Sequence, residues 1–141
     1  MKFMANAILV VLIMTIFIMV FSNFILFFPW YLTLMYQTYN LSVQAASENY
    51  VSTSMVADVK NDLVTRPIFS SMGADDIGVF MDEIKIDSFD PDYLQRGERF
   101  TVGLECSFPF EIKFGDASLE REVSVKFEIP TTGLRYYKDL E

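Results

Sequence analysis

The chain has 141 residues and a formal net charge of −8 at pH 7. Apart from Lys2, every charged residue lies after Ser47, where 10 basic residues oppose 19 acidic ones. This acidic surplus disfavours nucleic acid as a direct partner, because that affinity rests on Lys and Arg side chains neutralising phosphates. With no histidine and only one cysteine, Cys106, the chain lacks the commonest general base and metal ligand and cannot form an internal disulfide.

The 45 residues from Phe3 to Ser47 contain no Asp, Glu, Lys or Arg. As a helix this stretch is roughly 67 Å long, whereas a bilayer core about 30 Å thick needs only roughly 20 residues. Phe3 to Phe28 is apolar enough to span a membrane. We expect it to be retained, because a signal peptide has a shorter apolar core, about 7–15 residues, and a small-residue cleavage site. Lys2 and the acidic remainder favour a cytoplasmic N-terminus.

Beyond Phe28 the charge-free stretch continues where lipid no longer covers it. Pro29 is expected to kink the helix or to mark its exit from the membrane, because proline lacks the backbone donor. Apolar residues continue at helical spacing to Val64, so we predict one long helix that becomes amphipathic near Glu48 and ends before Pro67. The aromatic residues just after Pro29 suit either a belt at the membrane interface or packing between neighbouring helices.

We expect other copies of the chain to bury the charge-free residues that lie outside the lipid. The residues expected to pack in the core of such an assembly recur along the helix at Ile8, Leu12, Ile16, Phe24, Phe28, Tyr31, Leu34 and Leu41.

The C-terminal part has the alternation of a β-sheet. Residues 79–89 are a plausible first strand, and residues 100–114 alternate apolar and polar side chains without an error, which indicates one buried and one solvated face. Pro109 falls on the solvated side and indicates a sheet edge or a bulge. Gly115 to Ser118 predicts a hairpin turn before a return strand that reaches Ile129.

One apolar sheet face needs a second layer, and the helical residues 51–64 are the expected cover. We therefore predict an α+β fold in which a long hydrophobic helix packs its C-terminal half on a small antiparallel sheet. Residues 1–50 would form the transmembrane or filament-core helix, and residues 51–141 the amphipathic helix end with the β-domain. The expected β-domain core is Phe100, Val102, Leu104, Cys106, Phe108, Phe110, Ile112, Val123, Val125 and Phe127.

Residues suited to catalysis or metal binding are scarce. Cys106 alternates onto the buried face and has no histidine to activate it, so an inert core residue is expected rather than a nucleophile. Asp87, Asp90 and Asp92 share a loop and offer oxygen ligands for calcium, but their spacing matches no known calcium motif and suits a turn equally well. We expect no enzyme activity, no cofactor and no metal.

A hydrophobic N-terminal helix that runs into an amphipathic stem and a small antiparallel sheet resembles the type IV pilin-like proteins. The compact size and the strand Ser107 to Ile112 (Ser-Phe-Pro-Phe-Glu-Ile) look like the TadE-like pseudopilins, including those of Gram-positive conjugation systems. The resemblance implies a helix held in the membrane and later packed with others in a filament core. Members usually carry a glutamate five residues into the mature helix, where this chain has Ala5.

The expected function is therefore that of a pilin or pseudopilin, a structural subunit that polymerises through its helix. Its partners would be identical subunits, the cell membrane before assembly and membrane-bound assembly machinery. It would be single-pass in the membrane before assembly and extracellular in the filament afterwards, where adhesion, conjugation, motility and secretion suit it equally. The alternatives are a membrane component of a secretion or conjugation apparatus that does not polymerise, and a membrane-anchored binding module.

Overall fold

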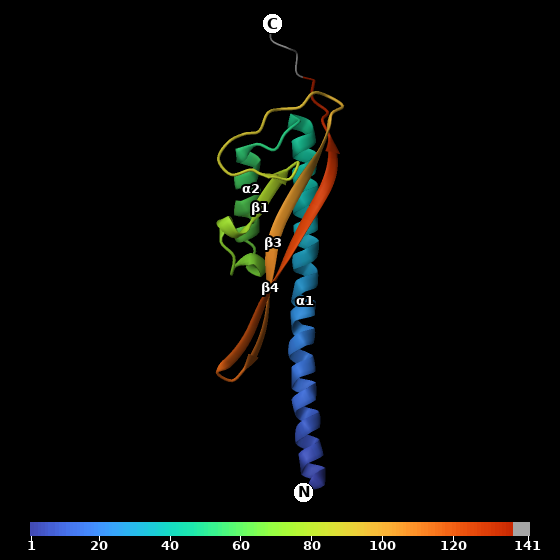
Figure 1. Ribbon diagram of the computed structural model, residues 1–141, viewed down its shortest axis with the longest axis vertical. Coiled ribbons are helices and arrows are strands. Elements are labelled where there is room, and N and C mark those ends of the chain that lie inside the picture. The colour runs from blue at the N-terminus through green and yellow to red at the C-terminus, as the bar shows by residue number, and fades with distance from the viewer. Residues whose placement is uncertain (137–141) are drawn as a thin grey trace.

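The computed structural model describes residues 1–136, and it confirms the α+β class (Figure 1). Two helices come first, α1 (Lys2–Glu48) and α2 (Thr53–Val64), followed by the short 3-10 turns η1 (Pro67–Phe69) and η2 (Ala74–Asp76). The strands are β1 (Gly78–Met81), β2 (Ile84–Lys85), β3 (Arg99–Phe114) and β4 (Ala117–Thr132). They form one antiparallel sheet in the order β2-β1-β3-β4. The N-terminal half of α1 extends beyond the rest as a rod (Figure 1).

The predicted single helix to Val64 is wrong, because α1 ends at Glu48. Asn49 takes the left-handed conformation (φ 66°, ψ 16°), which asparagine tolerates better than most residues. Its buried side chain donates to the Leu94 carbonyl and accepts from the Arg135 N–H, so the break is fixed by hydrogen bonds. Ser52 then caps α2 by accepting from the Met55 N–H, and α2 turns back beside α1.

The predicted strand over residues 79–89 is also wrong, because a tight turn divides it into β1 and β2. Asp82 and Glu83 form the turn, and both have positive φ angles of 48° and 67°. Two such residues suit the two-residue hairpin loop that matches the twist of its strands. The Asp82 carboxylate also accepts from the Thr101 N–H at 2.9 Å, which ties the turn to β3.

Strands β3 and β4 pair over their whole length, from Arg99 opposite Thr132 to Phe114 opposite Ala117. Strand β1 pairs only with residues 102–105 of β3, so beyond Glu105 the two long strands have only each other. Pro109 lies on this unpaired edge, where its missing N–H breaks no ladder bond. The distal part of the hairpin therefore leaves the sheet as a two-stranded ribbon.

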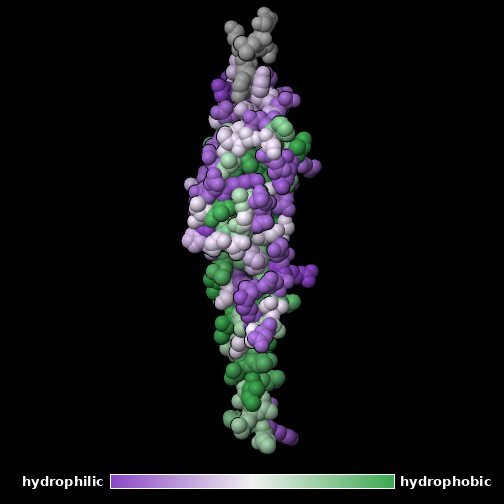
Figure 2. All heavy atoms as spheres, turned by 90° about the vertical axis from the view of Figure 1, so that its left-hand side faces the viewer, coloured by the Kyte–Doolittle hydropathy of each residue, from purple (hydrophilic) through white to green (hydrophobic). Residues whose placement is uncertain are grey.

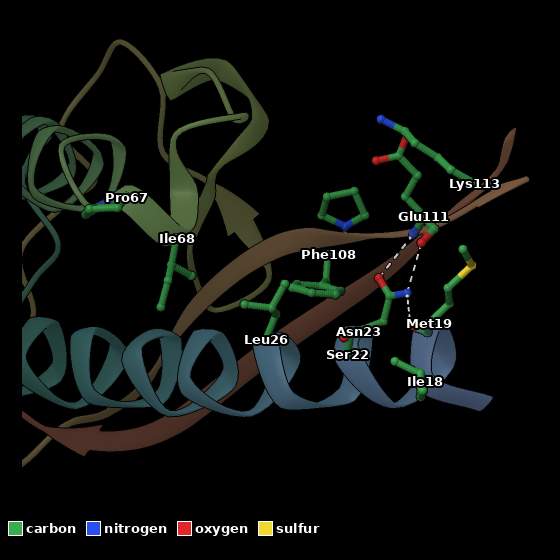
Figure 3. A pocket seen from close by; sticks show the side chains of 11 residues that line it. Ile18, Met19, Ser22, Asn23, Leu26, Pro67, Ile68, Phe108, Glu111 and Lys113 are labelled. Carbon is green, nitrogen blue, oxygen red and sulfur yellow. Dashed lines mark hydrogen bonds and ion pairs between the residues drawn. The ribbon is translucent and has the colours of Figure 1, made fainter. Parts of the chain in front are cut away.

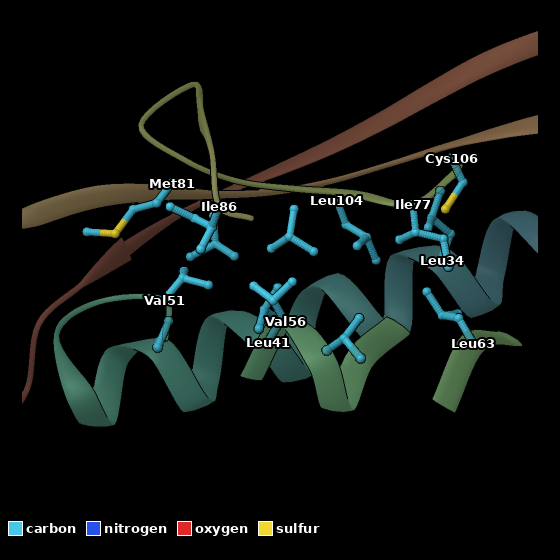
Figure 4. Close-up of a cluster of buried hydrophobic side chains, with 14 of the residues drawn as sticks. Leu34, Leu41, Val51, Val56, Leu63, Ile77, Met81, Ile86, Leu104 and Cys106 are labelled. Carbon is cyan, nitrogen blue, oxygen red and sulfur yellow. The ribbon is translucent and has the colours of Figure 1, made fainter. Parts of the chain in front are cut away.

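The sheet is covered mainly by the C-terminal half of α1, which lies along β3 and β4, whereas residues 51–64 were expected to be the cover. Helix α2 closes the side of the same core with Val56, Val59 and Leu63. Figure 4 shows helix side chains, including Leu34, Leu41 and Val56, facing the strand side chains Leu104 and Cys106. From the β-domain core predicted by sequence, Phe100, Val102, Leu104, Cys106 and Phe108 are fully or nearly fully buried. The other five are not: Phe110, Ile112, Val125 and Phe127 are only half-buried and Val123 is 41% exposed, because they lie on the distal hairpin or on the edge strand β4.

An aromatic cluster joins α1 to β3 at the lower end of this core. Trp30 is completely buried, and its ring centroid lies 5.7 Å from those of Phe27 and Phe69 and 5.2 Å from that of Phe108. Pro29 lies next to it inside α1, which continues through the proline as a helix. The only tryptophan of the chain therefore reports whether α1 is docked on the sheet.

Candidate functional site

Cys106 is buried in the core, as its alternation predicts. The pKa of its thiol is raised to about 12, chiefly by burial. The Glu105 and Asp76 carboxylates make smaller contributions in the same direction. Only the thiolate is a strong nucleophile, so the cysteine is chemically quiet near neutral pH.

Two of the three aspartates considered as calcium ligands, Asp87 and Asp90, have other partners. The Asp90 carboxylate accepts from the Thr53 N–H at 2.6 Å, at the start of α2, and Asp87 lies 3.7 Å from the Lys85 ammonium. Within residues 1–136, no group of three His, Cys, Asp or Glu side chains is placed to hold a metal ion. These contacts attach the loop to α2 and to β2.

The inner face of α1 is used within the chain. Leu34 and Leu41 are completely buried in the core, and Thr38, also completely buried, bonds its hydroxyl to the Leu34 carbonyl. This corrects the expectation that Leu34 and Leu41 pack against other copies. The sheet of the same chain therefore buries this face of α1, so the face needs no second copy.

The outer face of the same segment remains apolar and exposed. Leu32 and Leu34 are two positions apart, about 200° around the helix, so they point to nearly opposite sides, as do Leu41 and Val43. Steps of three and four residues keep the exposed side chains on one face. We call them the outer stripe: Phe28, Leu32, Met35, Tyr39 and Val43, which are 41% to 64% exposed.

The outer stripe continues into an N-terminal segment that has almost no cover. Of the residues expected to pack between copies, Ile8, Leu12, Phe24 and Phe28 are exposed, whereas Ile16 and Tyr31 are half-buried. Helix α1 is long and apolar enough to cross a membrane. Figure 2 shows the contrast, with hydrophobic residues forming the lower end of the molecule and hydrophilic residues most of the upper part.

The ribbon of β3 and β4 meets α1 at Asn23 (Figure 3). The Asn23 side chain donates to the Glu111 carbonyl at 2.9 Å and accepts from the Glu111 N–H at 3.3 Å. It also donates to the Met19 carbonyl one turn earlier in α1. We call the pair of bonds between Asn23 and Glu111 the clasp.

An open groove of about 620 Å³ lies beside the clasp, between α1, η1 and β3. Its walls are mostly apolar, with Met19, Leu26, Ile68 and Phe108 among them (Figure 3). The Lys113 ammonium and the Glu111 carboxylate, 2.8 Å apart, lie at its edge.

Sequence reasoning missed the clasp. The only available signal was an isolated asparagine inside an apolar run, because a polar side chain in such a place needs a hydrogen-bond partner. The partner is 88 positions away and is a backbone group, so no side-chain pattern points to it.

Comparisons of the chain with protein-family models, with curated proteins and with solved structures found no match.

Proposed function

We propose that the protein is a structural, non-catalytic subunit that associates with other copies of itself through the outer stripe and the N-terminal half of α1. Before assembly this half of α1 anchors the chain in a membrane. After assembly the helices form the core of an extracellular filament, and the acidic β-domains face outwards. The resemblance to pilin-like proteins agrees with this arrangement.

The observation that supports the proposal is the length of the outer stripe. If the hydrocarbon core begins next to Lys2, about 20 residues bring its far boundary to about residue 22. The stripe from Phe28 to Val43, which is about 22 Å long, then lies wholly outside the lipid. A contiguous apolar surface of this kind marks an interaction site, because water solvates it poorly.

A second copy is the occupant that fits this surface best. The stripe and the N-terminal segment form one continuous charge-free rod, so the same helix of another copy matches it in length and in chemistry. Each large apolar side chain that becomes buried contributes about 1.5–3 kcal/mol, so several per subunit supply the driving force without covalent links.

The test is a charge placed in the stripe. Met35→Glu should abolish filaments in sheared cell-surface material viewed by electron microscopy, and self-association of the purified chain after detergent removal. Gln44→Glu is the matched control, because Gln44 is an exposed polar residue of the same helix outside the stripe, and it should assemble normally. Filaments of normal length and number from Met35→Glu would refute the proposal. Retention of the native chain in the membrane as single copies would instead favour a component that does not polymerise.

A further inference from the structure

We infer that the distal hairpin, residues 109–122 of β3 and β4, and a lipid bilayer compete for the same level along α1. The clasp between Asn23 and Glu111 closes when that part of the helix is outside the bilayer and opens when lipid reaches it. The inference depends on α1 entering a membrane, and it does not depend on whether copies polymerise.

The distal hairpin and the membrane-spanning part of α1 overlap in position. The hairpin meets α1 at Asn23 and continues towards its N-terminus, because Phe114 borders one cavity of about 440 Å³ together with Ile8, Val11 and Thr15. Thr15 lies eight residues before Asn23, which is about 12 Å along the helix. A hydrocarbon core about 30 Å thick that begins next to Lys2 ends near Ser22. The closed hairpin and the lipid would therefore occupy the same level of the helix.

The charge of the distal hairpin makes contact with hydrocarbon unfavourable. The distal hairpin carries six charged side chains, which lipid at this level would surround: Glu111, Lys113, Asp116, Glu120, Arg121 and Glu122. Charged side chains are costly inside hydrocarbon. The ion pair between Lys113 and Glu111 does not remove this cost, because both side chains are partly exposed in the closed form. The hairpin and the full thickness of lipid thus exclude each other.

The distal hairpin is attached to the rest of the fold by few contacts. Beyond Glu105, β3 pairs only with β4, so its distal part can move without breaking the bonds to β1. Its described hydrogen bonds to α1 are the two of the clasp, and beside them the Phe110 ring contacts Phe24 and Phe27 at centroid distances of 6.1 and 5.7 Å. Figure 1 shows the end of the hairpin bending away from α1.

The position of Asn23 suits both states. In the closed form its amide has three hydrogen bonds, to Met19 and to both backbone groups of Glu111. In the open form Asn23 lies just past the last residue that the hydrocarbon covers, where headgroups and water replace the two bonds of the clasp.

The experiment varies bilayer thickness and measures the opening. The full chain, with Cys106→Ser, carries nitroxide labels at Ser22→Cys and Lys113→Cys, two positions that line the same groove. It is reconstituted as single copies in nanodiscs of phosphatidylcholine with either twelve-carbon or eighteen-carbon chains. Pulsed electron paramagnetic resonance then gives the distance between the labels. The thin bilayer should give a short distance and the thick bilayer a longer, broader one.

Two controls separate opening from unfolding. Labels at Lys113 and Ser118, which are direct cross-strand partners, should give the same distance in both bilayers because the hairpin itself stays paired. Asn23→Leu removes the clasp, so the distance between positions 22 and 113 should lengthen already in the thin bilayer. A distance between positions 22 and 113 that does not change with bilayer thickness, whether short or long, overturns the inference. The proposed filament is tested separately by Met35→Glu.

Discussion

Leu41 and Val43 lie two positions apart in α1, and their substitution distinguishes its two faces. Leu41 is completely buried against the sheet, whereas Val43 is 53% exposed in the outer stripe. Leu41→Ala removes three buried carbons and leaves a cavity, so we expect it to lower the free energy of unfolding by about 2–5 kcal/mol. Val43→Ala removes exposed carbons, and we expect a change within about 0.5 kcal/mol.

The assay is urea unfolding of the full chain in a mild detergent, followed by the fluorescence of Trp30. This side chain is completely buried between α1, η1 and β3, so its emission changes when α1 leaves the sheet. The two variants should have the same dependence on urea and different midpoints. Equal midpoints would contradict the assignment of an inner and an outer face, and so would a larger effect from Val43→Ala.

Three further predictions concern the loop after α1 and the β-domain, and the same unfolding assay serves the first two. Asn49→Ala should lower the free energy of unfolding by about 3 kcal/mol, because it removes the hydrogen bonds to Leu94 and Arg135 and places alanine in a left-handed conformation. A loss below about 1 kcal/mol would contradict the role given to Asn49. Gly133→Ala should also destabilise the fold, since its Cβ would lie 2.8 Å from the Asn49 side chain, whereas unchanged stability would show that the neighbours can give way. Cys106 should react with maleimide about 1,000-fold more slowly at pH 8 in the folded chain than in urea, because a thiol pKa of about 12 leaves little thiolate. Equal rates in the two conditions would mean that the thiol is accessible in the folded chain.

The sequence was informative wherever a pattern depends only on neighbouring residues. The alternation from Phe100 to Phe114 correctly predicted a strand, whose buried face extends only as far as Phe108, and the charge-free run correctly predicted a long helix. The end of that helix was missed because periodicity continues across residues 49–52, while the break depends on Asn49 bonding to Leu94 and Arg135 far along the chain. The turn at Asp82 was missed for a similar reason, since both turn residues have charged side chains and neither is a glycine.

The candidate site was predictable only in outline. Composition predicted that α1 needs a packing partner, but it could not say which face the sheet covers, so the prediction put Leu34 and Leu41 among the contacts between copies. The apolar side chains on the two faces of α1 are alike, and only the register of the helix on β3 and β4 separates them. The expected boundary at residue 50 coincides with the loop after α1, yet the half of α1 that contains Trp30 and Leu41 belongs to the core of the β-domain.

The most direct measurement of the central claim is cross-linking between copies through the outer stripe. In a Cys106→Ser background, Leu32→Cys and Tyr39→Cys are treated with a short bis-maleimide in membranes or assembled material, with Gln44→Cys as the comparison. The account predicts a ladder of covalent multimers from the double variant and single chains from Gln44→Cys. Single chains from both, in material where the cysteines are shown to react, would contradict it.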